Sequence, residues 1–145
     1  MKKDAILRII DANLNRTREG LRVCEDIARF FLQDKKASNA LKAVRHRATN
    51  LVLGAEKISL DEILSGRDTG GDKSKFSDFA PPPDMDIADI FMSNIERVKE
   101  SLRVMEECFK VIDERISRGY RKLRFDTYGI EKKIVKKARL VSRNG

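Results

Sequence analysis

The chain has 145 residues, of which 41% are hydrophobic and 37% charged, and its formal net charge is +8 at pH 7. These values are typical of one globular domain with a real core, and they exclude collagen-like, low-complexity and disordered chains. No apolar run is long enough to span a membrane, the first residues lack the apolar region of a signal peptide, and two Cys provide neither a zinc site nor a disulfide framework. We therefore expect one cytoplasmic domain formed by residues 1–145.

The first half of the chain is predicted to form two long helices. Apolar residues recur at alternating steps of four and three along residues 4–33, which is the period of a helix that packs against its neighbours. A second helix is expected near residues 38–56, with Ser38 or Asn39 as its N-cap. A short helical turn is expected at residues 59–65.

The second half repeats this organisation after a linker rich in Gly and Pro at residues 65–86. We expect a helix near residues 86–116, which begins after Asp84 or Asp86, and a last helix near residues 119–141. No segment alternates polar and apolar residues long enough to predict a strand. The predicted fold class is all-α, a bundle of long antiparallel helices.

The excess of positive charge lies in residues 115–145, in the predicted last helix and tail. A nucleic-acid-binding face would spread its cations over several elements, with stacking aromatic residues between them. A solvated basic helix or a site for a small anion fits this distribution better. A nucleic-acid partner is therefore disfavoured, and no membrane partner is expected, since the apolar runs are too short to span a bilayer.

The sequence also repeats itself. Shifted by 81 positions, NLNRTREGLRVCE (13–25) aligns with NIERVKESLRVME (94–106), and a shift of 79 aligns residues 41–51 with 120–130. Each unit contains a long helix, a break and a second helix, so two units predict an approximate two-fold axis inside one chain. The two units are residues 4–56 and 86–141.

Polar residues interrupt an otherwise apolar row on the first helix at Asn13 and Arg16, and the second unit does the same at Asn94 and Arg97. Polar groups at the margin of a core must find partners, because each unpaired buried group costs ~1–3 kcal/mol. A satisfied network of ion pairs and a ligand site are both consistent with this pattern, and both stay open. For Glu25 with Arg29 and for Arg18 with Arg22, we expect ordinary side-chain contacts that contribute to stability alone.

The segment RDTGGD, which begins at Arg67, is a second candidate site. Gly70 and Gly71 permit backbone conformations that turn successive N–H groups toward an anion, and the guanidinium of Arg67 can grip a phosphate at two points. Asp68 and Asp72 can hold Mg²⁺ directly or through water. A flexible surface turn explains the glycines equally well, and the segment is not a Walker loop.

Taken together, these motifs resemble one family, the alternative hydroxymethylpyrimidine-phosphate kinases, a helical domain often fused N-terminally to thiamine-phosphate synthase. The combination of DANxNRxxEGLRxxED with RDxxGD is specific, and the resemblance covers nearly the whole chain but not the synthase barrel. We therefore expect a stand-alone domain without synthase activity. The stretches that carry the resemblance are RIIDANLNRTREGLRVCEDIARF (8–30), LKAVRHR (41–47), RDTGGD (67–72), NIERVKESLRVMEE (94–107) and YRKLRFDTYGIEK (120–132).

The resemblance implies a thiamine-biosynthesis kinase that transfers the γ-phosphoryl group of ATP, with Mg²⁺, to hydroxymethylpyrimidine phosphate. A phosphate monoester has a second pKa near ~6, so the attacking oxygen is already ionised and needs no general base. What remains for the protein is positioning and charge neutralisation. At the matching motif positions, the expected catalytic residues are Arg67, Asp68, Asp72, Arg16 and Glu19. The expected substrate-binding residues are Asp11, Asn13, Arg22, Glu25, Gly70, Gly71, Arg45, Asn94 and Arg97. The expected Mg²⁺ ligands are Asp68 and Asp72.

One site per chain is expected, mostly on unit one and residues 67–72, because the second unit has Met92 in place of Asp11 and no second RDTGGD. A homodimer that shares the site stays open. The alternative function is a non-catalytic ligand-binding or regulatory partner domain of a thiamine-phosphate synthase, which predicts binding without turnover.

Overall fold

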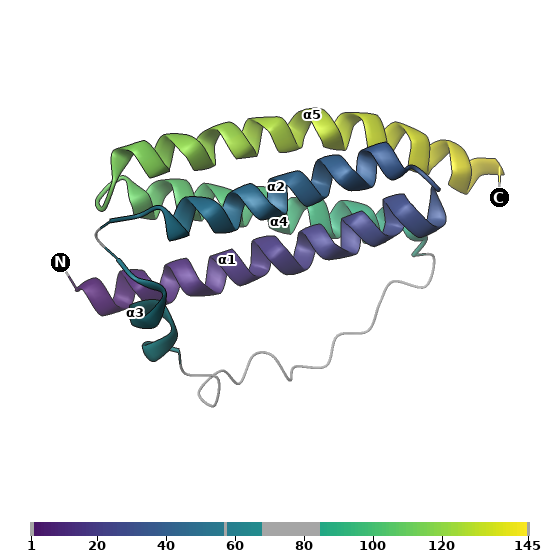
Figure 1. The fold of residues 1–145 in the computed structure, drawn as a ribbon. Helices are drawn as coiled ribbons and strands as arrows, with labels where there is room; N and C mark the ends of the chain where they lie inside the picture. Colours follow the sequence, from purple (N-terminus) through teal and green to yellow (C-terminus); the bar gives the residue numbers. More distant parts are fainter. Residues whose placement is uncertain (1, 57, 68–84, 145) are drawn as a thin grey trace.

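The computed structural model describes residues 2–56, 58–67 and 85–144, and within them the chain is helical without strands (Figure 1). The predicted all-α fold class is confirmed. The helices are α1 (Lys3–Asp26), a π-helical turn (Ile27–Phe31), α2 (Lys35–Leu53), the short α3 (Leu60–Ser65), α4 (Ile87–Phe109) and α5 (Glu114–Asn144).

The four long helices form an antiparallel bundle. Both α1 and α5 pack against α2 and α4, so the order around the bundle is α1, α2, α5, α4, and Figure 1 shows each long helix running opposite to both neighbours. The short α3 lies against the N-terminal half of α1. Within the described residues, no helix combines the length and the hydropathy needed to cross a bilayer.

The apolar rows that the periodicity predicts supply most of the core, except that Phe31, at the end of the row on the first helix, is 51% exposed. Each large apolar side chain that is fully buried contributes ~1.5–3 kcal/mol, and all four long helices supply such residues. Phe109 of α4 stacks on Tyr120 of α5 with ring centroids 5.6 Å apart, and the Tyr120 hydroxyl donates to the Ala48 carbonyl of α2 at 2.6 Å. The largest fully buried residues include Ile10, Leu21, Leu41, Phe91, Ile95, Leu102, Met105, Phe109, Tyr120 and Leu123.

The N-cap predicted for the second helix was wrong. Helix α2 begins at Lys35, and its cap is Asp34, whose carboxylate accepts from the Ala37 amide at 3.0 Å. Ser38 lies one turn inside the helix, where its hydroxyl donates to the Glu25 carbonyl of α1 at 3.1 Å. The start predicted for α4 was right, because Asp86 and Asp89 form a capping box there.

The third predicted helix, near residues 86–116, ends earlier than expected. Helix α4 stops at Phe109, and the Asp113 amide donates to the Phe109 carbonyl at 2.8 Å as the chain reverses into α5, which begins at Glu114 rather than at residue 119. The apolar period continues through Ile112 because this side chain is buried at the turn, not because it is helical.

The turn between α1 and α2 corresponds to the turn between α4 and α5, but the two differ in length. In unit one the Asp34 amide donates to the Ala28 carbonyl at 2.8 Å, which matches the contact between Asp113 and Phe109 in unit two. The first reversal spans two more residues than the second, which is the difference between the sequence shifts of 81 and 79. A π-helical turn absorbs extra residues inside a helix, and the π-turn Ile27–Phe31 stands at this place.

Candidate functional site

Arg67 lies directly after α3 and grips Asp11 of α1 at two points. Its Nε donates to Oδ2 at 2.9 Å and its Nη2 to Oδ1 at 2.5 Å. The Asp11 side chain is 11% exposed and that of Arg67 is 39% exposed, and the paired carboxylate raises the pKa of the guanidinium. The pair therefore holds the first residue of RDTGGD on the helix that carries the DANLNR motif, and it brings two sequence-predicted site residues together.

Asp11 belongs to a polar row along the contact between α1 and α2. Asp11, Asn15, Arg18 and Arg22 are separated by steps of four, three and four, so they share one face of α1. We call this row, together with Thr49 of α2, the α1/α2 seam. Arg22 is exposed, whereas Asn15 and Arg18 are half-buried.

Beneath the seam, Glu25 and Arg45 form a buried ion pair. Arg45 Nε lies 2.8 Å from Glu25 Oε2, and Nη2 lies 3.1 Å from Oε1. Both residues were predicted to bind substrate, and in this structure their charged groups bind each other.

A chain of hydrogen bonds links this buried pair to the seam surface. The Thr49 hydroxyl donates to the Arg45 carbonyl at 3.3 Å, and Arg18 Nη1 donates to the Thr49 hydroxyl. Sequence reasoning missed Arg18 and Thr49. A comparison of the two units position by position could have found Arg18, because the carboxylates beside its counterpart are absent here.

That counterpart, Lys99, lies on the corresponding contact between α4 and α5. Lys99 pairs there with Glu96 and, at 2.9 Å, with Glu131. Burial lowers the pKa of Lys99, but the hydrogen bonds from both carboxylates outweigh it and raise this pKa above the ordinary value. Under the sequence shifts, Glu96 and Glu131 correspond to Asn15 and Val52 of unit one. The second contact is therefore neutralised, and the α1/α2 seam carries excess positive charge.

The remaining polar candidates lie on the other side of α1, along α4. The Asn13 amide donates to the Ile9 carbonyl and the Asn94 amide to the Ile90 carbonyl, each at 2.8 Å. Helices α1 and α4 approach each other closely here. A Cβ on Gly20 would lie only 3.0 Å from the Asn94 carbonyl oxygen. Arg16 contacts Asn13 at 3.4 Å, and Arg97 and Glu19 are exposed. The structure thus does not bring Asn13, Arg16, Asn94 and Arg97 together with Asp11 and Arg67.

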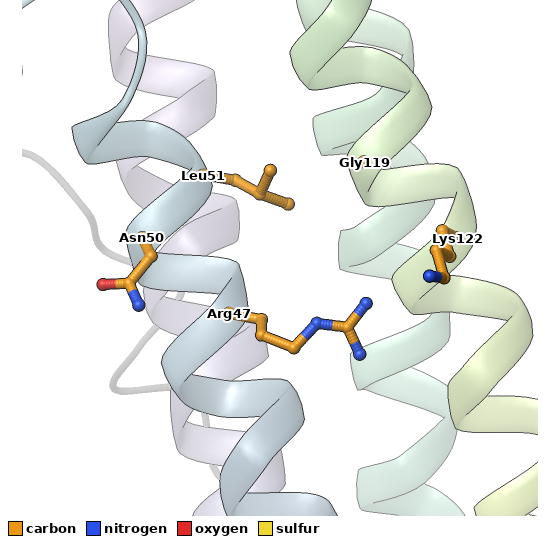
Figure 2. A pocket seen from close by; sticks show the side chains of 5 residues that line it. All are labelled: Arg47, Asn50, Leu51, Gly119 and Lys122. Atoms are coloured by element: carbon orange, nitrogen blue, oxygen red, sulfur yellow. The ribbon is translucent and has the colours of Figure 1, made fainter.

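Four candidates, Asp68, Gly70, Gly71 and Asp72, lie outside the described residues, so their predicted roles stay predictions. Within the part of the chain that the structure describes, no group of three or more His, Cys, Asp or Glu side chains could hold a metal ion. A hollow of about 240 Å³ lies between α2 and α5, beside the contact of Leu51 with Gly119, and Arg47 extends across it (Figure 2). None of the described candidates lines this hollow.

Residues 8–133 match the ThiD2 family. The chain is 30% identical over 136 residues to the thiamine-phosphate synthase of Nostoc punctiforme, covering 92% of this chain and 36% of that synthase. It is 33% identical over 128 residues to the thiamine-phosphate synthase of Synechocystis sp., covering 88% and 35%. The chain spans about a third of the length of these curated relatives. No solved structure shows significant similarity to it. The family indicated by the motifs is confirmed, and the chain belongs to the ThiD2 family.

Proposed function

We propose that this protein is a thiamine-biosynthesis kinase that transfers the γ-phosphoryl group of ATP to hydroxymethylpyrimidine phosphate and forms the diphosphate. The observation that carries the proposal is the ion pair between Asp11 and Arg67, because it joins the two most specific motifs of the chain in one place. Membership of the ThiD2 family and similarity to thiamine-phosphate synthases support thiamine biosynthesis as the context.

The chemistry needs little from the protein beyond positive charge and positioning. An ionised oxygen of the acceptor phosphate attacks the γ-phosphorus, a new P–O bond forms, and the bond from the γ-phosphorus to the bridging oxygen breaks as ADP leaves. Arg67 spends its Nε and one Nη2 hydrogen on Asp11, so its Nη1 edge stays able to donate to a phosphate oxygen. Asp11 orients this guanidinium, and Arg22 adds a second exposed cation on the same side of α1.

MgATP is the proposed form of the co-substrate. Since the described residues alone offer no cluster of three metal ligands, the proposed protein ligands of Mg²⁺ are Asp68 and Asp72, acting together with the nucleotide phosphates. Asp11 is not proposed as a ligand, because Arg67 occupies both of its carboxylate oxygens.

The test is ADP release from MgATP with three acceptor conditions: hydroxymethylpyrimidine phosphate, its free alcohol, and no acceptor. Phosphorus NMR of the products identifies a diphosphate. We expect ADP and diphosphate in equal amounts only with the phosphate ester. A folded protein that binds the ester but yields no diphosphate would contradict the kinase and favour the regulatory-domain alternative.

A further inference from the structure

Arg18 is a half-buried cation whose charge meets no carboxylate among the described residues. The contact that the structure gives it is with the uncharged Thr49 hydroxyl, which itself donates to the Arg45 carbonyl. The nearby carboxylate of Glu25 is paired with Arg45 through both of its oxygens. Partial burial of a charge costs free energy unless an opposite charge compensates it. This position therefore favours the arrival of an anion.

In the second unit, carboxylates of the chain itself compensate the charge at the corresponding position. There Lys99 lies between Glu96 and Glu131, with its side chain 15% exposed. Unit one keeps the cation and replaces both carboxylates, with the neutral Asn15 and Val52. If the role of Arg18 were only to stabilise the bundle, we would expect carboxylates at these two positions in unit one as well. Their replacement leaves room for a counter-charge from outside the chain.

The place of Arg18 on α1 connects it to the proposed active site. Arg18 lies about two turns, or about 10 Å, beyond Asp11 and Arg67 on the same helix face, and Arg22 lies about one turn further. A ligand with a phosphate group at Arg18 therefore lies along the seam, within reach of the exposed side of Arg67.

We propose that Arg18, with the Thr49 hydroxyl and Arg22, forms a phosphate-binding subsite in the α1/α2 seam. This proposal rests on the proposed function for its ligands, since the phosphate belongs either to the pyrimidine phosphate or to ATP. The guanidinium supplies the charge, and Thr49 accepts from Arg18 and can donate its hydroxyl proton to the ligand instead of to the Arg45 carbonyl. The subsite exists once per chain, because the matching position of unit two is already neutralised.

The test is calorimetric titration at fixed ionic strength with three ligands: hydroxymethylpyrimidine phosphate, its free alcohol, and ATP. The informative variant is Asn15→Glu, which recreates on α1 the spacing of Glu96 and Lys99 and provides Arg18 with an internal counter-charge. Because Asn15 is a half-buried position at the rim, the variant is expected to fold with an unchanged melting temperature. The matched control is Ala43→Glu, which adds the same charge on exposed α2 one turn before Arg47.

We expect Asn15→Glu and Arg18→Gln to weaken binding of one phosphate ligand at least about tenfold, because a hydrogen bond to a charged group is worth ~1.5–3 kcal/mol. Ala43→Glu and wild type should bind alike, and Arg18→Lys should recover part of the affinity. The ligand whose affinity falls identifies the source of the phosphate. Unchanged affinity for both phosphate ligands in Arg18→Gln would overturn the subsite.

The subsite and the kinase fail separately. Suppose that the wild-type protein binds the ester but forms no diphosphate, and that Asn15→Glu loses this binding. This result would support the subsite and overturn the kinase. Full diphosphate formation by Arg18→Gln at subsaturating ester and ATP keeps the kinase and overturns the subsite.

Discussion

Glu25 and Arg45 form a two-point ion pair in the core between α1 and α2, with side chains only 7% and 6% exposed. Glu106 and Arg124 form the corresponding pair between α4 and α5, where Arg124 Nε and Nη2 both donate to Glu106 Oε1. Ser38 and Ser117 each donate a hydroxyl to the carbonyl of the paired glutamate, at 3.1 Å and 2.7 Å. The helix pair α1/α2 and the helix pair α4/α5 are thus each held together by the same set of polar contacts.

The pair of Glu25 with Arg45 predicts that a single variant loses much more stability than the double variant. Arg45→Ala should lower the free energy of unfolding by ~3–5 kcal/mol, because it leaves the Glu25 carboxylate buried without a partner. The double variant Glu25→Leu/Arg45→Met should stay near wild type, since it removes both charges. Urea unfolding measures both. A double variant that folds normally but no longer binds the pyrimidine phosphate would support the binding role that the sequence predicts for these residues.

Arg67→Ala should abolish most of the proposed kinase activity while the protein still folds. The loss expected is at least about a hundredfold in kcat, the size seen when one preorganised charge-stabilising donor is removed. The melting temperature should fall only modestly, because the Arg67 side chain is substantially exposed, although its removal leaves the Asp11 carboxylate, which is 11% exposed, without this partner. The matched control is Lys3→Ala, which breaks the ion pair at 2.8 Å between Lys3 of α1 and Glu62 of α3 and should leave activity intact. Equal losses in both variants would mean that Arg67 only holds α3.

The helices were predictable because their apolar period depends on local sequence alone. The start of α4 was predictable too, because its capping box is local, but other helix ends were not, because they depend on tertiary partners. Ser38 is a good cap in isolation, but its hydroxyl is used by the Glu25 carbonyl, and Asp34 caps α2 instead. At the end of α4, buried Ile112 continues the apolar period beyond the last helical residue.

The candidate site was predictable only in part for the same reason. The motifs singled out Asp11 and Arg67, but their contact joins residues far apart in the sequence, and nothing local reveals it. The sequence analysis did not identify Arg18 as a site residue, because an arginine on a helix surface is ordinary by itself. Its significance depends on Asn15 and Val52, which are notable only when compared with Glu96 and Glu131 of the second unit.

Gly20 is required where α1 crosses α4. A Cβ at this position would lie 2.8 Å from Val98 Cγ2 and 3.0 Å from the Asn94 carbonyl oxygen, so Gly20→Ala should destabilise the bundle by ~1–3 kcal/mol through overpacking. Gly129 is the matched control, because a Cβ there has no neighbour within 4 Å. Gly129→Ala should stabilise α5 by ~0.5–1 kcal/mol, as expected for an exposed helical glycine. Thermal unfolding of both variants tests this; a stable Gly20→Ala would contradict the close approach.

Asp34 should make the stability of the protein depend on pH in the acid range. The Ala37 amide that it caps, opposed by partial burial and assisted by Lys137, holds the pKa of the Asp34 carboxyl below its ordinary value of 3.8. Because the pKa is lower in the folded state, the stabilisation is fully present above pH 3.8 and is lost as the pH falls through the folded-state pKa. Asp34→Ala should therefore cost ~0.5–2 kcal/mol at pH 7, the value of an N-cap, and less below that pKa.

Asp34→Asn separates the cap from the charge. Asn caps helices about as well as Asp but does not titrate, so its stability relative to Asp34→Ala should vary little with pH, while wild type should lose its advantage over Asp34→Asn in acid. Urea unfolding of the three proteins between pH 7 and about pH 2.5 measures these differences. If the gap between wild type and Asp34→Ala stayed constant over that range, the carboxylate would not be the group that caps α2.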